Sequence, residues 1–166
     1  MKLYVMRHGP AEDHSPTGRD ADRALTHSGR ERVRVVAKAL ADGGEAPLAI
    51  VSSPLVRSLQ TAEIVASLVS VPTVEVRREM APGGDKLALL AELVRDRRKR
   101  VMVVGHEPEL SMLVDRLLGH SLDDGMLKAM VVGARLTPTE PGVEGIGFTA
   151  SLRFVLDPKT LDWQRP

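Results

Sequence analysis

The chain of 166 residues contains no cysteine. This absence excludes disulfide bonds, thiol catalysis and thiolate metal sites, and it is compatible with a reducing compartment. Aromatic residues make up only 2% of the chain, so stacking on nucleic-acid bases is not expected. The core must therefore be built from aliphatic side chains and methionine.

The chain also lacks an excess of charge of either sign. Lys and Arg total 23 and Asp and Glu total 22, which leaves a net charge of +1. That balance provides no long-range field to attract nucleic acid or a membrane surface. No apolar stretch approaches the ~20 residues that span a bilayer, and the apolar run at residues 3–6 is too short for a signal peptide. We therefore expect a cytoplasmic protein whose partners include neither nucleic acid nor membrane.

Length and composition indicate one folded unit. Hydrophobic residues make up 43% and charged residues 27% of the chain, as in ordinary globular proteins. The length predicts a single domain over residues 1–166. Such a domain buries roughly 70% of the surface that its unfolded chain exposes, so it needs no structural metal to fold.

Short apolar runs alternate with amphipathic segments along the chain. Short apolar runs predict strands at 3–6, 48–51, 71–76, 101–104, 127–137 and 148–156. Apolar residues with the period of a helix predict helices at about 28–41, from Ser53-Pro54 onward, around 87–94 and after 106. Ser53 is expected to cap the second of these helices. A Gly/Pro-rich turn is expected at 138–147. This order predicts an α/β protein with a mostly parallel central sheet of about six strands, covered on both faces.

Residues that can do chemistry follow three of the expected strands. The first strand ends in Arg7-His8-Gly9, the fourth ends in Gly105-His106, and Ser52-Ser53-Pro54 is followed by Arg57. Ligands of open α/β sheets bind in the crevice at the carboxyl ends of the strands. We therefore expect two histidines and two arginines to converge there.

Two guanidinium groups and two imidazoles suit a dianionic phosphoryl group. Arginine offers a planar fork of donors that fits phosphate oxygens two at a time. A histidine that is neutral near pH 7 can attack phosphorus with one ring nitrogen, while the other holds its proton on a nearby backbone carbonyl. Gly9 allows that carbonyl to approach closely.

Taken singly, these residues have simpler interpretations. A histidine after a strand is often a cap or a solvated loop residue, and an arginine one turn into a helix usually lies on the surface. His14, His27 and His120 are interpreted in this way, as loop, cap-region and helix-end residues. The combination of three motifs at three strand ends is what makes the pattern specific.

At these positions the chain resembles the histidine phosphatase (phosphoglycerate mutase-like) superfamily. The resemblance rests on four segments, namely 3–9 (LYVMRHG), 25–29 (LTHSG), 52–62 (SSPLVRSLQTA) and 103–106 (VVGH). The short chain, the segment 79–85 (EMAPGGD), the segment 106–108 (HEP) and the ending 154–158 (FVLDP) resemble the SixA-type phosphohistidine phosphatases in particular.

The resemblance implies a three-layer α/β/α sandwich and a hydrolase active in signal transduction. It implies that His8 is the nucleophile, that Arg7 and Arg57 bind the phosphoryl oxygens beside Gly9, and that His106 completes the pocket and stabilises the transferring group. Water would then release phosphate from His8. No metal or organic cofactor is implied.

The chain differs from many members of the superfamily because it lacks an evident carboxylate to protonate the leaving group. Many members place a carboxylate in a long insertion that this chain lacks. Glu79 is the nearest positional candidate, followed by Asp85, with Glu12 and Asp13 in the first loop. A phosphohistidine has a labile P–N bond whose leaving imidazole needs less help than an alkoxide. The short chain therefore favours a phosphohistidine on a protein, such as a phosphotransfer domain.

Two alternatives stay open from the sequence. One is a small-molecule phosphomonoesterase of the same superfamily, which would need the proton donor. The other is a non-catalytic module that binds a phosphorylated protein, although such a module could dispense with His8. A mutase is less expected, because the chain is too short for a lid that shields the intermediate from water.

Overall fold

A computed structural model describes residues 1–119, 121–140 and 145–166 of the chain. His120 and part of the turn expected at 138–147 lie outside these described residues. The described strands form one seven-stranded sheet in the order β3-β2-β4-β1-β5-β6-β7. Their bounds are β1 (Lys2–Arg7), β2 (Ala49–Ser52), β3 (Val74–Val76), β4 (Arg100–Gly105), β5 (Val131–Pro138), β6 (Phe148–Leu156) and β7 (Trp163–Gln164).

The sheet has a parallel half and an antiparallel half. Strands β3, β2, β4 and β1 run parallel, because each of the first three connections carries a helix that returns the chain to the same edge. Strands β5, β6 and β7 add antiparallel neighbours beyond β1. The predicted α/β class is confirmed, but the described sheet has seven strands rather than about six, and it is mixed rather than mostly parallel because its last three strands pair antiparallel.

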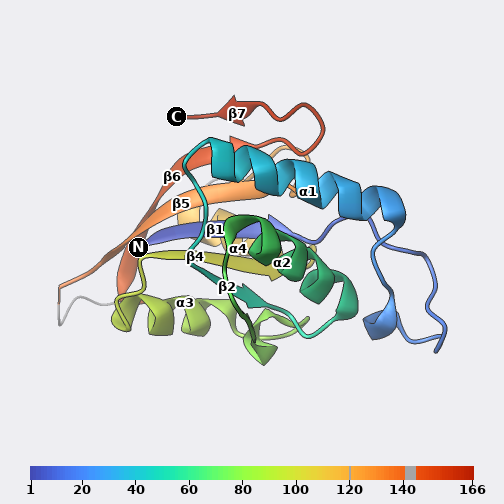
Figure 1. Cartoon of the computed structure of the whole chain (residues 1–166). Coiled ribbons are helices and arrows are strands. Elements are labelled where there is room, and N and C mark those ends of the chain that lie inside the picture. Colours follow the sequence, from blue (N-terminus) through green and yellow to red (C-terminus); the bar gives the residue numbers. More distant parts are fainter. Residues whose placement is uncertain (120, 141–144) are drawn as a thin grey trace.

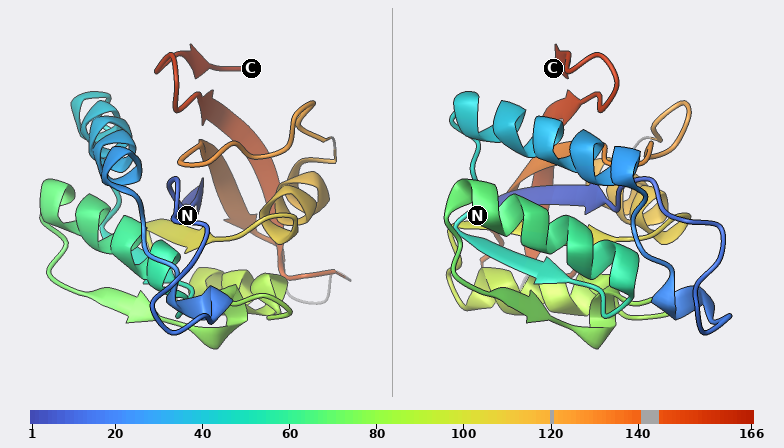
Figure 2. Two further views of the ribbon diagram at one scale, coloured as in Figure 1. Left: turned by 90° about the vertical axis from the view of Figure 1, so that its right-hand side faces the viewer. Right: turned by 45° about the vertical axis from the view of Figure 1, so that its right-hand side comes forward.

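Helices cover both faces of the sheet, as Figures 1 and 2 show. Helices α1 (His27–Asp42) and α2 (Val56–Val69) lie on one face, and α3 (Lys86–Arg95) and α4 (Glu109–Leu118) lie on the other. The side chains of β1 alternate between them: Leu3 and Val5 pack in the core with α3 and α4, whereas Tyr4 and Met6 pack with α1 and α2. This alternation follows from the two-residue period of a strand buried on both faces.

Two helix starts illustrate local sequence signals. Thr26 caps α1, since its Oγ1 accepts a hydrogen bond of 2.9 Å from the Gly29 amide. The prediction that Ser53 caps the second helix was wrong. Helix α2 begins at Val56, three residues later, and the Ser53 hydroxyl lies 2.8 Å from a ring nitrogen of His106 instead.

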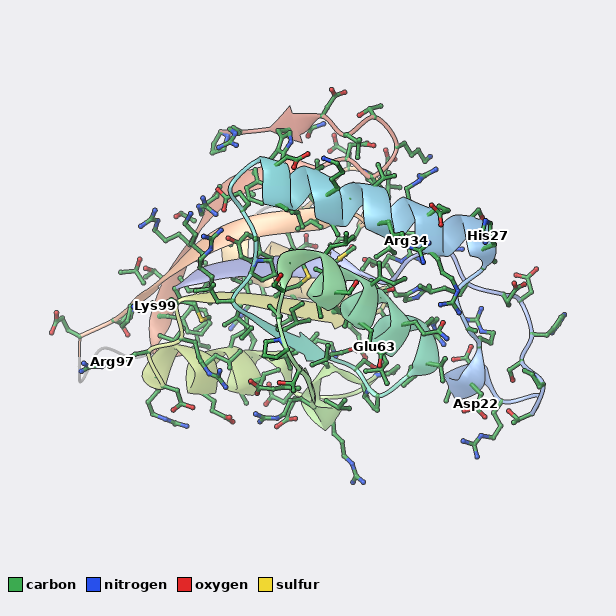
Figure 3. All side chains as sticks on the ribbon, in the orientation of Figure 1. Asp22, His27, Arg34, Glu63, Arg97 and Lys99 are labelled. Atoms are coloured by element: carbon green, nitrogen blue, oxygen red, sulfur yellow. The ribbon has the colours of Figure 1, made fainter. Side chains whose placement is uncertain are left out.

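The carboxyl ends of three neighbouring parallel strands meet at one edge. Arg7 of β1 is opposite Gly105 of β4, and Ser52 of β2 is opposite Val104. The chain leaves β1 and β2 toward α1 and α2 but leaves β4 toward α4 on the other face, which opens a crevice at this edge. A short 3-10 helix, η1 (Asp20–Asp22), lies beyond the same edge, where Figure 3 labels Asp22.

Arg97 and Lys99, which Figure 3 labels, lie between the end of α3 and the start of β4, at the opposite edge of the sheet. Within the described ranges, none of the helices combines the length and the hydropathy that crossing a bilayer requires.

Candidate active site

His8 follows the last residue of β1, and the hydrogen bonds of its ring determine which nitrogen carries the proton. Its Nδ1 donates a hydrogen bond of 2.7 Å to the Gly9 carbonyl oxygen. Because a carbonyl can only accept, Nδ1 carries the proton and the lone pair resides on Nε2. Arg57 Nε donates to that Nε2 across 3.2 Å. The backbone therefore selects the tautomer in which Nε2 can act as a nucleophile.

The imidazole of His8 is neutral at pH 7. The side chain is buried, and this burial lowers the pKa of His8 to about 4, with the positive charges of Arg57 and Arg7 acting in the same direction. A neutral ring keeps its lone pair available for attack on phosphorus.

Gly9 fits closely against its neighbours. A Cβ at this position would lie 2.6 Å from Cγ2 of Val33 in α1, so no larger residue fits without a shift. The Gly9 amide donates to Thr61 Oγ1 at 3.1 Å, and that hydroxyl donates to the Arg57 carbonyl at 2.8 Å. The turn that holds His8 is thereby attached to the first turns of α2.

Arg57 connects His8 with a carboxylate from the first loop. Its Nη1 donates to the backbone carbonyl of Asp20 at 2.9 Å, and its Nη2 donates to Oδ2 of Asp20 at 3.1 Å. Asp20 also accepts from Arg23 Nε at 2.8 Å. Asp20 was missed at the level of sequence. It belongs to no motif, and an acidic residue in a polar loop is by itself an ordinary surface residue.

Arg7 has a different environment from Arg57. Its Nη1 donates to the Met126 carbonyl at 2.8 Å, while its Nε is buried with no hydrogen-bond partner among the described residues. Burial lowers the pKa of Arg7, although Glu107 opposes this effect. Arg7 remains charged, and no salt bridge of the described residues includes it.

His106 follows β4 and faces His8, with 5.3 Å between the two ring centroids. Its Nε2 lies 2.8 Å from Ser53 Oγ and 3.2 Å from Ser58 Oγ. Burial lowers the pKa of His106 to about 3, and Arg57, together with the His8 ring once acid has protonated it, acts in the same direction. Ser53 and Ser58 lie within the sequence motif, but their contact with this ring appears only in the folded chain.

Among the described residues, the acidic candidates form no hydrogen bond with the side chains of this cluster. Glu79, in the 3-10 helix η2 (Arg78–Met80), receives hydrogen bonds of 2.6 and 3.2 Å from Arg77. This pairing holds the pKa of the Glu79 carboxyl below its ordinary value, so the carboxyl is ionised at neutral pH. Asp85 caps α3 through the Ala88 amide, and Glu12 and Asp13 belong to the first loop. The structure thus brings together Arg7, His8, Arg57 and His106, and it leaves Glu79 outside their hydrogen bonds.

The donor set of the cluster suits an anion rather than a cation. Two guanidinium groups and two imidazoles can each donate to an oxyanion. In the ranges 1–119, 121–140 and 145–166, no group of three or more His, Cys, Asp or Glu side chains is arranged to hold a metal ion.

This fold and this cluster define a class of protein, the histidine phosphatases with a phosphoglycerate mutase-like fold. The sequence profile described as "Histidine phosphatase superfamily (branch 1)" matches residues 3–83. The chain is 37% identical over 142 residues to an uncharacterized protein of Picosynechococcus, covering 81% of this chain and 85% of that protein. It is 31% identical over 121 residues to the phosphohistidine phosphatase SixA of Escherichia coli, covering 70% of this chain and 74% of that protein.

A solved structure of a SixA protein has the same fold as this chain. The protein histidine phosphatase SixA, complexed with tungstate, superimposes with a TM-score of 0.82 at 26% identity, covering 98% of this chain and 100% of that one. The chain therefore belongs to the histidine phosphatase superfamily, whose members are phosphatases, and it is a SixA-like member of it. The resemblance identified from the sequence is confirmed.

Proposed function

We propose that the protein hydrolyses phosphohistidine through a covalent phosphohistidine intermediate on His8. The observation that carries this proposal is the state of the His8 ring: neutral, with its proton on Nδ1 and its lone pair on Nε2, beside the Nε–H of Arg57. That is the arrangement required of a nitrogen nucleophile.

The reaction takes two displacements at phosphorus. In the first, the lone pair of His8 Nε2 forms a bond to phosphorus while the bond to the substrate nitrogen breaks, and the leaving imidazole takes a proton from solvent. Arg57 Nε–H, no longer bonded to Nε2, turns to a phosphoryl oxygen. In the second, water attacks phosphorus, the electron pair of the N–P bond returns to Nε2, the proton of the water passes to solvent, and inorganic phosphate leaves.

Arg7, Arg57 and His106 are proposed to stabilise the charge of the transferring group. Three buried side-chain polar atoms in the described ranges have no hydrogen-bond partner, and two of them are Arg7 Nε and His106 Nδ1. Buried donors normally have acceptors. We expect the oxygens of a phosphoryl group bound between the rings of His8 and His106 to accept hydrogen bonds from these two atoms. The tungstate bound by SixA is a tetrahedral oxyanion of similar shape.

The His106 tautomer follows from the same contacts. Ser53 Oγ accepts from the Leu55 amide at 3.3 Å, so its own hydrogen is free to point at His106 Nε2. With Nε2 accepting from the serine hydroxyls, Nδ1 carries the proton and donates to the phosphoryl group. His106 then acts as a hydrogen-bond donor while uncharged.

The proposed substrate is a phosphohistidine on a protein, such as a phosphotransfer domain, and the predicted cytoplasmic role in signal transduction belongs to the same proposal. The relative in Escherichia coli is named a phosphohistidine phosphatase. The ionised state of Glu79 supports this choice over a phosphomonoester, because an alkoxide leaving group needs a protonated acid.

The nucleophile is tested by trapping the intermediate. A histidine-phosphorylated phosphotransfer domain, labelled on phosphorus, is mixed with the protein and quenched in base. We expect an acid-labile phosphoenzyme and release of phosphate, unchanged in the presence of a metal chelator. His8→Ala should abolish both, whereas His27→Ala, at the outer end of α1 (Figure 3), should retain both. A phosphoenzyme formed by His8→Ala would overturn the proposed nucleophile, and binding without turnover would indicate a non-catalytic module.

The pH dependence of the rate distinguishes the proposed function from the small-molecule alternative. A phosphomonoesterase with Glu79 as proton donor would lose activity as that carboxyl ionises, and Glu79→Gln would abolish this dependence. We expect instead that Glu79→Gln leaves turnover of the phosphorylated protein within about twofold of the unsubstituted protein, since Glu79 bonds to Arg77.

A further inference from the structure

The two arginines of the cluster differ in their charge balance. Arg57 has a formal counterion, because Asp20 offers it both a carboxylate oxygen and a carbonyl oxygen, at 3.1 and 2.9 Å. Arg7 donates to the neutral Met126 carbonyl at 2.8 Å, and the charge of Glu107 acts on it without forming an ion pair among the described residues. Both guanidinium groups lie beside the same imidazole, and both contribute to the low pKa of His8. Of the two guanidinium groups, Arg57 is therefore the one that has a carboxylate in direct contact among the described residues.

Asp20 reaches Arg57 from outside the core. Its side chain is 65% exposed while that of Arg57 is 7% exposed. Arg23 holds the carboxylate from the other side through its Nε at 2.8 Å, and Arg23 is itself held by the Glu12 carbonyl at 2.9 Å. These contacts keep the Asp20 carboxylate in one place at the mouth of the crevice.

Asp20 also determines which edge of the guanidinium faces His8. The five N–H donors of an arginine lie in a fixed planar fork. Asp20 occupies the edge formed by Nη1 and Nη2, and the edge that contains Nε is left toward His8 Nε2. This second edge is the one that meets the phosphoryl oxygens in the proposed reaction.

We propose that Asp20 is a positioning residue that also limits the affinity of the site for its product. With both histidines neutral, Arg7 and Arg57 carry the positive charges of the four clustered side chains, and the Asp20 carboxylate offsets that of Arg57, which it contacts. Inorganic phosphate resembles the transferring group, so a pocket with more positive charge would hold the product longer and slow its release. The proposal rests on the proposed function, in which Arg57 contacts phosphoryl oxygens.

The test compares two charge-neutralising substitutions on the same short helix. Asp20→Asn removes the charge beside Arg57 and keeps an acceptor of the same size. Asp22→Asn is the matched control, because Asp22 pairs with Arg19 and Thr17 and not with Arg57. Calorimetric titration with inorganic phosphate, and separately with tungstate, gives the dissociation constants, and steady-state kinetics with the phosphorylated protein give kcat.

We expect Asp20→Asn to bind both oxyanions on the order of tenfold more tightly, after allowance for the exposure of the carboxylate, with a lower kcat. Asp22→Asn should change neither constant by more than about twofold. Tighter binding is an outcome that mere loss of structure cannot produce. Equal or weaker binding by Asp20→Asn than by Asp22→Asn would overturn the proposal, and Asp20→Ser, a second neutral replacement, gives the same comparison if Asp20→Asn folds poorly.

Failure of this inference is distinguishable from failure of the proposed function. If the unsubstituted protein forms the phosphoenzyme and binds phosphate while Asp20→Asn binds no tighter, only the role of Asp20 is rejected. If the unsubstituted protein forms no phosphoenzyme and binds no phosphate, the proposed function is rejected together with it.

Discussion

Arg57 Nε donates a hydrogen bond of 3.2 Å to His8 Nε2, the nitrogen proposed to attack phosphorus. The cation therefore covers the nucleophile before substrate arrives and opposes its protonation. When a phosphoryl group enters, the same N–H can turn from the ring nitrogen to a phosphoryl oxygen. One contact thus serves both to keep the imidazole neutral and to place a donor where negative charge develops.

Arg57 should be irreplaceable by lysine. Arg57→Lys keeps the charge, but a single ammonium group cannot serve His8 and both oxygens of Asp20 with the geometry of the guanidinium fork. We expect kcat/KM to fall on the order of 10²–10³-fold for Arg57→Ala and by at least roughly tenfold for Arg57→Lys, measured as phosphate release. Arg34→Ala, in the exposed pair with Glu31, is the control and should be silent. A lysine variant with full activity would contradict the bidentate role.

The serines that contact His106 should affect turnover through the orientation of that ring. Ser53→Ala removes a hydrogen bond of 2.8 Å and Ser58→Ala one of 3.2 Å. We expect each substitution to lower kcat by roughly 2–10-fold. If one hydroxyl can replace the other, the fold-loss of kcat in the double variant should differ from the product of the two single fold-losses. Ser67→Ala, at an exposed position on α2, controls for the change in the helix. Unchanged kcat in the double variant would exclude the proposed orientation.

Folding stability should fall in mild acid because of His8. Its pKa is about 4 in the folded protein, below the ordinary value of about 6.5 for the unfolded chain. The unfolded state therefore binds the proton first, and stability is lost as pH falls from about 6.5 toward 4. We expect a loss on the order of 3 kcal/mol from this residue, measured by urea unfolding at several pH values. His8→Asn should reduce the loss in this window and leave the part that His106, with its pKa of about 3, contributes. An equally steep curve would show that His8 does not cause the loss.

Glu45 should affect stability without affecting catalysis. It is 6% exposed and accepts hydrogen bonds from Tyr4 and Arg153. Burial alone would raise its pKa, but Arg153 and Tyr4 outweigh that effect and lower the pKa of Glu45 to about 2. We expect Glu45→Gln to cost roughly 2–4 kcal/mol of unfolding free energy, measured by urea denaturation at pH 7. Glu31→Gln, in an exposed ion pair, should cost less than about 1 kcal/mol.

The kcat of Glu45→Gln should stay within about twofold of the unsubstituted value. Tyr4 and Lys2, which contact Glu45, lie toward the start of β1, whereas His8 follows the end of that strand. A large loss of kcat in a variant that remains folded would show that the two ends of β1 are coupled.

The strands and the convergence of the four residues of the candidate site were predictable because both depend on short-range patterns. The apolar run at 101–104 became β4 with one residue added at each end. His8 and His106 follow parallel neighbours in register, Arg7 opposite Gly105, and parallel strands bring their carboxyl ends to one edge. The convergence of these residues follows from the order of helices and strands, because that order makes β1 and β4 parallel neighbours.

The contact of Asp20 with Arg57 and the contacts of Ser53 and Ser58 with His106 were not predictable in this way. They depend on how the first loop and the start of α2 pack in the folded chain. The first loop is placed by a β-bridge between Ala11 and Leu25 and by the Leu25 amide, which donates to Gln60 Oε1 of α2 at 2.8 Å. No periodicity encodes such contacts between segments 35 residues apart. Local residue order therefore specifies His8, the proposed nucleophile, and its two arginines. The long-range packing of the loop on α2 supplies Asp20, the carboxylate that pairs with Arg57.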